Sequence, residues 1–213
     1  MTELDHIAVV APDLASGLAW VREALGVDMP SAGGKHPEMG THNRLLGLGP
    51  EVYLEVIAID PEASQPPHRR WFGLDDREMV GRHWREGRRL RSYAVRCTDI
   101  AATIGGEGGT FGAPMPVSRG DRQWLFAVRP DGALPMGGAL PCLIDWGERG
   151  TPAPTMPDLG FRLQGLRVET PDPDVVGAAL DAIGMAHKPE IERGPQVRLA
   201  ATIATPDGVR VLT

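Results

Sequence analysis

The sequence predicts an α+β protein in which paired βαβββ modules form a curved, cup-shaped mixed sheet with helices on the outside, followed by a third, partial module. A strand-then-helix pattern occurs three times along the chain, which indicates a repeated structural unit. The composition agrees with short elements joined by many turns, since 213 residues include 27 glycines and 20 prolines and are 42% hydrophobic. These glycines and prolines are spread through aperiodic sequence, so they do not indicate low complexity.

The repeated unit begins with a strand that ends at an aspartate. Runs rich in apolar and β-branched residues lead to Asp13, Asp99 and Asp172. An aspartate at this position can accept hydrogen bonds from the free N–H groups of the first helical turn. We therefore expect helices over residues 14–25, 100–104 and 175–183, each stopped near a glycine, at Gly26, Gly105 and Gly184.

Each expected helix is followed by a loop and a hairpin-like pair of strands. The first hairpin should turn at Gly49-Pro50 and the third at Pro206–Gly208, whereas a long loop over 130–141, a candidate lid, separates the second pair. A single unit has a helix on only one side of its sheet, so it must pair with another unit to bury the rest. We expect one domain over 1–160, with modules at 1–62 and 88–150 joined by an arginine-rich helical linker at 63–87, and a partial βαββ module at 161–213.

Composition also excludes several classes of function. The net charge of −6 argues against nucleic acid as a partner, because phosphate binding needs a basic surface. No apolar stretch approaches the roughly 18 residues that span a bilayer, and no leader precedes the first strand, so we expect a cytoplasmic protein without a membrane partner. Cys97 and Cys142 are too few for a disulfide framework or a thiolate zinc site, and we expect buried thiols.

Several segments, in this order, resemble the vicinal oxygen chelate superfamily. They are the opening Leu4–Ile7, the helix start Pro12–Leu14, the helix end Ala24–Gly26 and the strand Tyr53–Ile57. Gly40–Asn43, Arg70–Gly73 and Pro141–Trp146 are similar to the glyoxalase-like domain family within it. The resemblance covers about residues 4–170 and implies a cup-shaped sheet that holds a small-molecule substrate.

Glu55 is the most informative polar residue of the first module. Period two places His6 on the same strand face as Ala8. A hairpin that turns at Gly49-Pro50 pairs Arg44 with Glu55, so that His42, Arg44 and Glu55 share a face. A carboxylate in an otherwise apolar strand is costly to bury unless it is paired or bound to metal. From the residues alone, three alternatives stay open: a metal ligand, an ion pair with Arg44, or a side chain that faces water.

The resemblance implies a metal site in the first module. Superfamily ligands come from the first and last strands of a module, where His6 and Glu55 stand, and His42 is a candidate third ligand. This set suits Mn, Fe(II), Ni or Zn, with Glu55 and His42 as catalytic residues. The second module offers Ser92 in place of His6, and we expect no histidine or glutamate at the inward positions of 141–145. A metal would therefore be held by one module only, or not at all.

A substrate-binding wall is predicted from arginines and tryptophans in family-like positions, with Arg119 beside them: Arg44, Arg70, Trp71, Arg122, Trp124 and Trp146. The alternative for the tryptophans is that they fill the core of a chain with few aromatics. His36 is expected in a loop and receives no role.

Two functions of different class follow. One is a metal-dependent isomerase, lyase or dioxygenase that chelates neighbouring oxygens of a small organic substrate. The other is a cofactor-free protein that binds and sequesters a small molecule. The third module adds a structural alternative, since its free sheet edge would be covered if the chain formed a homodimer.

Overall fold

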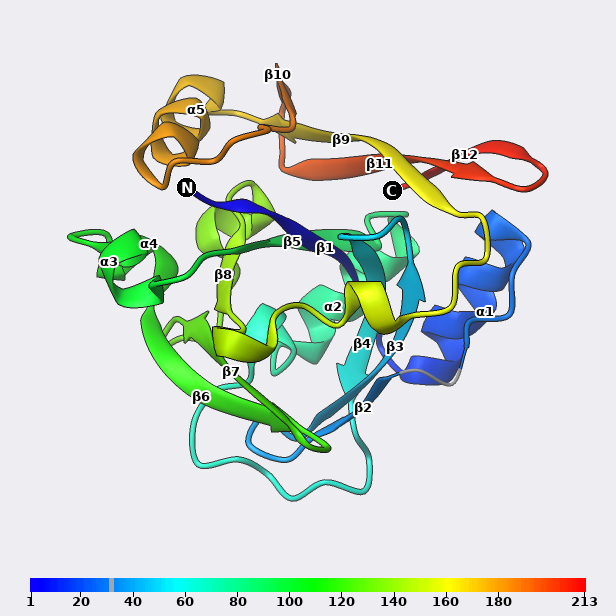
Figure 1. The fold of residues 1–213 in the computed structure, drawn as a ribbon, viewed down its shortest axis with the longest axis horizontal. Helices are drawn as coiled ribbons and strands as arrows, with labels where there is room; N and C mark the ends of the chain where they lie inside the picture. The colour runs from blue at the N-terminus through cyan, green and yellow to red at the C-terminus, as the bar shows by residue number, and fades with distance from the viewer. Residues whose placement is uncertain (31–32) are drawn as a thin grey trace.

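A computed structural model describes residues 1–30 and 33–213, which form two sheets with helices outside them (Figure 1). The first sheet has eight strands in the order β2-β3-β4-β1-β5-β8-β7-β6, and the second has four in the order β10-β9-β11-β12. The predicted α+β class, with its curved mixed sheet, is confirmed.

The first module comprises β1 (Glu3–Val10), α1 (Leu14–Leu25), β2 (Gly33–His36), β3 (Thr41–Gly47) and β4 (Tyr53–Ile59). The linker carries η1 (Trp71–Gly73) and α2 (Arg77–Arg85). The second module comprises β5 (Leu90–Arg96), α3 (Ile100–Ile104), α4 (Gly108–Phe111), β6 (Ala113–Arg119), β7 (Arg122–Val128), η2 (Pro135–Gly138) and β8 (Cys142–Asp145), and η3 (Gly147–Arg149) and η4 (Ala153–Thr155) follow it. The C-terminal part comprises β9 (Arg162–Thr170), α5 (Pro173–Ala182), β10 (Glu190–Arg193), β11 (Arg198–Thr205) and β12 (Gly208–Leu212).

The two modules of the large sheet are joined through their first strands. β1 pairs antiparallel with β5, while β1 pairs parallel with β4 and β5 pairs parallel with β8. The outermost strands curve toward each other, and Glu38, which follows β2, bonds to the backbone N–H and hydroxyl of Ser118 on β6 at 3.1 and 2.6 Å. The sheet is therefore a nearly closed cup, and we call its concave side the cup.

The period of two along β1 separates two hydrophobic cores. Ala8 and Val10 belong to the core inside the cup, whereas Ile7 and Val9 belong to the core outside it. Both faces of the strand are thus buried, as the uninterrupted apolar run predicts.

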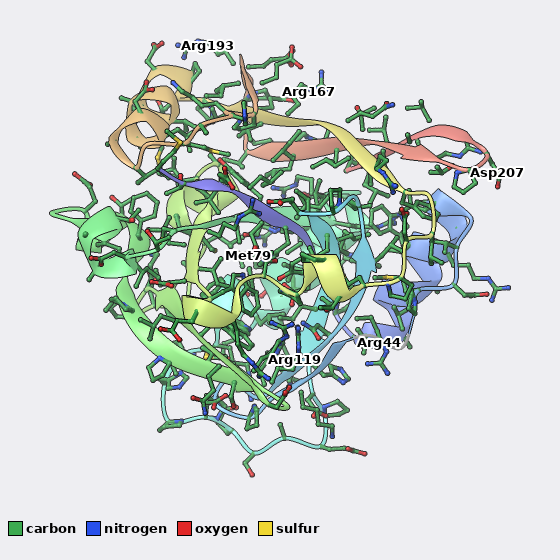
Figure 2. All side chains as sticks on the ribbon, viewed as in Figure 1. Arg44, Met79, Arg119, Arg167, Arg193 and Asp207 are labelled. Atoms are coloured by element: carbon green, nitrogen blue, oxygen red, sulfur yellow. The ribbon has the colours of Figure 1, made fainter. Side chains whose placement is uncertain are left out.

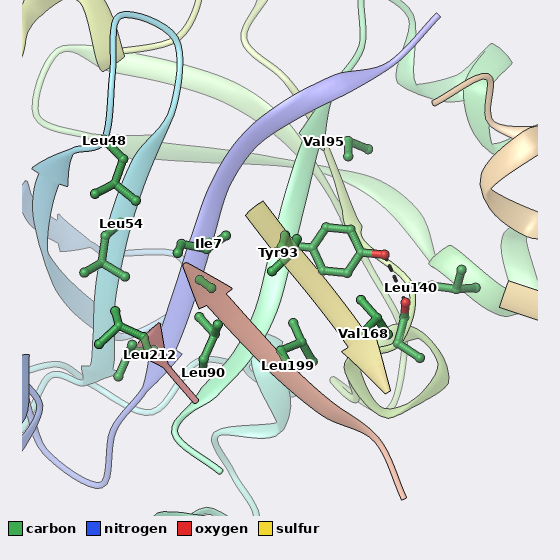
Figure 3. Packing of buried hydrophobic residues seen from close by; sticks show 14 of the residues in the cluster. Ile7, Leu48, Leu54, Leu90, Tyr93, Val95, Leu140, Val168, Leu199 and Leu212 are labelled. Atoms are coloured by element: carbon green, nitrogen blue, oxygen red, sulfur yellow. Dashed lines mark hydrogen bonds between the residues drawn. The ribbon is translucent and has the colours of Figure 1, made fainter. Parts of the chain in front are cut away.

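The second sheet covers the outside of the first (Figure 3). Val168 of β9 and Leu199 of β11 are buried in the same core as Leu90 and Tyr93 of β5. The Tyr93 hydroxyl donates a hydrogen bond to the carbonyl of Ala139 at 3.0 Å, so this buried polar group has a partner inside the core. The expected βαββ module has one more strand than predicted, the short edge strand β10.

The helix boundaries follow the predicted signals with one exception. The side chains of Asp13 and Asp99 accept from the backbone N–H groups of Ser16 and Ala102, at 2.8 and 2.9 Å. Asp172 makes no such bond, and the helix that follows it begins with Pro173, which suits the first helical position. The three helix-ending glycines have positive φ. In the part of the chain that the structure describes, no helix has the length and apolar character needed to cross a membrane.

Candidate functional site

Asp5 and His6 are neighbours in sequence, yet both side chains lie inside the cup. The pairing of β1 with β5 shifts between Leu4 and His6, and this β-bulge leaves Asp5 outside the ladder. Asp5 Oδ1 lies 2.7 Å from His6 Nδ1, and its Oδ2 accepts from the indole N–H of Trp146 at 3.0 Å. The bulge therefore supplies His6 with a buried carboxylate that fixes the orientation of its ring.

His6 Nε2 faces Glu55 of β4. The distance from Nε2 to Glu55 Oε2 is 3.5 Å, and the two residues are only 3% and 6% exposed. The His6 ring stacks on Tyr53 with 4.7 Å between centroids. Burial, with the charges of Asp5 and Glu55 nearby, raises the pKa of the Tyr53 phenol well above its usual value, so the phenol stays neutral. Two buried carboxylates thus flank one imidazole.

The other oxygen of Glu55 continues a chain of buried polar groups. Asn43 Nδ2 donates to Glu55 Oε1 at 2.5 Å and lies 3.4 Å from His36 Nε2. His36 Nδ1 lies 3.0 Å from the hydroxyl of Thr41, which accepts from the indole N–H of Trp71 at 3.2 Å. We call Asp5, His6, Glu55, Asn43, His36 and Thr41 the polar chain; it has a tryptophan at each end.

The predicted pairing of Arg44 with Glu55 is wrong by one residue. Leu45 stands opposite Glu55, and Arg44 stands opposite Val56. The last hydrogen bond before the turn runs from the Leu48 N–H to the Val52 carbonyl at 2.8 Å. The turn is therefore centred on Pro50 and not between Gly49 and Pro50, as predicted from the sequence. A slip of one residue moves every side chain to the other face. His42 and Arg44 therefore lie outside the cup, and Asn43 takes the place expected for them.

The prediction that His36 lies in a loop is wrong, because this residue is buried at the end of β2. Its ring makes edge contacts with Trp71 and Trp124, with centroids 5.1 and 5.9 Å away. Burial, followed by the charge of Arg119, lowers the pKa of His36 to about 3. The imidazole is therefore neutral near pH 7 and acts as a link in the polar chain.

The structure brings the three predicted tryptophans together with His6 and Glu55. Trp71, Trp124 and Trp146 are all buried inside the cup, and the rings of Trp124 and Trp146 lie 4.9 Å apart. These tryptophans lie next to the polar chain and are also part of the inner hydrophobic core. Their position is therefore compatible both with a binding wall and with a core-filling role.

Of the three predicted arginines, Arg44 and Arg70 lie away from this cluster. Arg44 bonds to the carbonyl of Asn43 outside the cup, and Figure 2 shows it beside α1. Arg70 is buried, bound to Asp75 at 2.6 Å and to the side chain of Gln65, so it braces the linker. Arg122 lies on the cup side of β7 but donates to the carbonyl of Gly150.

The second module places Ser92 and Cys142 where the first has His6 and Glu55. Ala8 pairs with Glu55 in the first module, and its counterpart Ala94 pairs with Cys142 in the second. Ser92 Oγ and Cys142 Sγ are 3.6 Å apart, and burial raises the pKa of the thiol to about 12. The expectation that histidine and glutamate are missing from these positions is confirmed.

The donor set fits a metal ion only in part. In residues 1–30 and 33–213 no group of three His, Cys, Asp or Glu side chains is arranged to hold an ion. His6 Nε2 and Glu55 Oε2 offer two adjacent ligands, and the carboxylate of Asp5 on His6 Nδ1 is the usual support of a metal-binding histidine. An ion here would have two protein ligands, and the substrate and water would supply the rest.

Sequence reasoning missed Asp5, Asn43, Tyr53 and the role of His36. One signal was available for the first of these. Two consecutive polar residues, Asp5 and His6, interrupt an apolar strand, and only a bulge places both on one side. Asn43 and His36 depend on the hairpin register and carry no local signal.

Comparison with known proteins agrees with this cup of two modules. The sequence profile of the glyoxalase-like domain family matches residues 4–184, and the chain belongs to this family. No curated protein matches the chain.

Solved structures show a similar fold. A hypothetical protein from Staphylococcus aureus superposes with a TM-score of 0.62 at 12% identity, covering 100% of this chain and 99% of its own. A Streptomyces coelicolor methylmalonyl-CoA epimerase gives a TM-score of 0.42 at 17% identity, covering 70% of this chain and 97% of that chain. The Mycobacterium tuberculosis methylmalonyl-CoA epimerase gives 0.40 at 18%, covering 68% and 89%. The first likeness shows that the second sheet belongs to a recurring fold.

Proposed function

We propose that this protein is an enzyme of the vicinal oxygen chelate type, an isomerase or lyase that moves a proton on a small organic substrate with two neighbouring oxygens. The observation that supports this most strongly is the Asp5–His6–Glu55 arrangement inside the cup. A carboxylate base and an imidazole stand side by side, each held by a further polar group, next to buried aromatic side chains.

Each residue has a distinct part in this proposal. Glu55 takes a proton from the carbon beside the substrate carbonyl, using Oε2, because Asn43 occupies Oε1. His6, oriented by Asp5, directs Nε2 into the same site, where its lone pair would bind the ion described below. Tyr53 fixes the plane of the His6 ring by stacking.

A divalent ion is part of the proposal. His6 and Glu55 would hold it, and Mn, Fe(II), Ni or Zn suit a nitrogen and a carboxylate oxygen. When bound, such an ion polarises both substrate oxygens as a Lewis acid. Asp5 then serves as the outer carboxylate that keeps His6 in the ligating orientation.

The test compares Glu55→Gln with Glu23→Gln, which changes an exposed glutamate of α1. Elemental analysis and turnover of 2-oxo aldehyde thiol adducts are measured for both. We expect Glu55→Gln to lose bound metal and at least about hundredfold in turnover, because a positioned base contributes roughly that much. Glu23→Gln should match the wild type. Wild-type turnover in Glu55→Gln would refute the role of this carboxylate.

Binding without catalysis is the second candidate. It is favoured by Ser92 and Cys142, which leave the second module without the usual ligands, and by the tryptophan-lined cup. A ligand that raises the unfolding temperature equally before and after chelator treatment, and in Glu55→Gln, would support it. Metal-dependent turnover would rule it out.

A further inference from the structure

Arg119 lies on the cup side of β6. It stands directly opposite Arg122 and two residues from Val117, which is buried inside the cup. Figure 2 labels it within the curve of the sheet. Among the residues that the structure describes, its guanidinium makes no hydrogen bond or ion pair, and its recorded contact is with the ring of Trp124. The neighbouring carboxylate, Glu38, is directed at Ser118 instead.

The hairpin places two positive charges opposite each other. Like charges in directly opposed positions of an antiparallel pair destabilise the pair. Arg122 offsets this in part by donating to the carbonyl of Gly150 at 3.1 Å, whereas Arg119 has its contact with the ring of Trp124. An anion bound by both guanidinium groups would remove the repulsion between them.

Trp124 adds a second donor without an acceptor. Trp124 is 6% exposed, and its indole N–H is buried with no hydrogen-bond partner among the described residues. The guanidinium carbon of Arg119 lies 5.8 Å from the Trp124 ring. A buried donor without a partner is rare in native structures, and a bound water or ion is one of its explanations. An oxygen anion could accept both from this N–H and from the half-exposed guanidinium of Arg119.

The strand that faces Arg119 leaves room for it. A Cβ added at Gly34 of β2 would lie 3.1 Å from Arg119 Cγ and 3.4 Å from its Cδ. A larger residue would displace the arginine, so the glycine keeps Arg119 in the seam between β2 and β6.

We propose that Arg119, Arg122 and the indole N–H of Trp124 form a subsite for the carboxylate of a small organic acid, at the β2–β6 seam of the cup. This inference rests on the proposed function, and it names the charged group of that substrate. A carboxylate fits because a guanidinium binds its two oxygens in one plane. Neutral His36 adds no further positive charge, so the subsite does not favour a more highly charged anion. Because the Trp124 N–H is buried, binding must shift the indole.

Lactate and its uncharged amide, lactamide, test the subsite, since they differ only in the carboxylate. Binding is followed by tryptophan fluorescence and by calorimetry in the wild type, Arg119→Gln and Arg210→Gln, which changes an arginine on the second sheet. We expect Arg119→Gln to weaken lactate binding roughly ten- to hundredfold, the effect of one charge-assisted hydrogen bond. Arg210→Gln should bind as the wild type does, and lactamide should bind poorly to all three. Trp124→Phe, which keeps the ring and removes the N–H, should weaken lactate binding severalfold.

Equal lactate binding in Arg119→Gln and the wild type would overturn the proposal, as would lactamide binding as tightly as lactate. Inorganic phosphate that binds more tightly than lactate would overturn the assignment to a carboxylate. Glu55→Gln separates the two proposals. If it keeps lactate binding that Arg119→Gln has lost, the subsite stands whether or not proton transfer is found. If turnover depends on Glu55 and not on Arg119, only the subsite fails.

Discussion

At the scale of single residues, the centre of the cup depends on one irregularity in β1. The bulge at Asp5 places two consecutive side chains on one side of a strand, which regular alternation forbids. Without it, Asp5 would point into the outer core, where an unpaired carboxylate is costly. The same residue orients His6 and satisfies the N–H of Trp146, so this bulge links the chemistry of the site to its aromatic wall.

His36 should make the stability of the protein depend on pH. Its pKa is about 3 in the folded state, below the ordinary value of 6.5, so the unfolded chain binds a proton more readily. The contribution of neutral His36 is fully present above pH 6.5 and is lost as the pH falls toward 3. We expect the wild type to lose roughly 3 to 5 kcal/mol more than His36→Gln between pH 7 and 3.

Urea unfolding over this pH range measures the difference. His187→Gln, which changes an exposed histidine, is the control and should follow the wild type. Parallel pH profiles for the wild type and His36→Gln would contradict the buried, neutral state of His36.

At the scale of elements, the β3–β4 hairpin decides which residues reach the site. Its register is set by a turn centred on Pro50, and the outer face carries Leu46, Leu54 and Val56 against α1. That apolar packing holds the register, because a slip of one residue would bury Arg44 in the cup and expel Asn43.

Gly17 of α1 shows how closely this helix packs on the hairpin. A Cβ at Gly17 would collide with the side chains of Val56 and Ala11. Glycine to alanine in a helix normally stabilises by about 0.5–1 kcal/mol. We expect Gly17→Ala instead to destabilise by roughly 1–3 kcal/mol, the usual cost of overpacking.

Gly177→Ala in α5 is the matched control, because nothing lies within 4 Å of the added carbon there. It should leave stability unchanged or raise it. In a Val56→Ala background, Gly17→Ala should cost less, and chemical denaturation of the four variants measures this coupling. A stabilising Gly17→Ala in the wild-type background would show that α1 is not seated on β4 in this way.

At the scale of the whole molecule, one outer core joins the two sheets. Buried side chains from β9 and β11 share it with β1, β4 and β5, so the second sheet is part of the cooperative unit of the first. The cup therefore has its back covered by the C-terminal part of the chain, while its polar chain faces inward.

Leu199→Ala tests this coupling between the sheets. All five tryptophans precede residue 147, so their fluorescence reports on the first part of the chain alone. Removing the buried Leu199 side chain should cost roughly 2–4 kcal/mol. We expect a single transition that shifts equally by tryptophan fluorescence and by circular dichroism.

Val211→Ala, at a side chain 57% exposed on β12, should change stability little. A Leu199→Ala variant whose fluorescence transition stays at the wild-type position would show that the second sheet unfolds independently.

The sequence by itself determined the modular α+β fold, the helix ends at Gly26, Gly105 and Gly184, and the placement of His6 on the same strand face as Ala8, because these follow from local patterns: period two, capping residues and glycine at positive φ. It also determined that the second module lacks the His–Glu pair. Only the tertiary structure decided which residues of β3 meet Glu55, that Asp5 turns inward, and that the guanidinium of Arg119 has no hydrogen-bond partner among the described residues. These depend on the centre of one turn, on one bulge and on the approach of β2 to β6, and each joins residues far apart in the chain through contacts that no local pattern specifies.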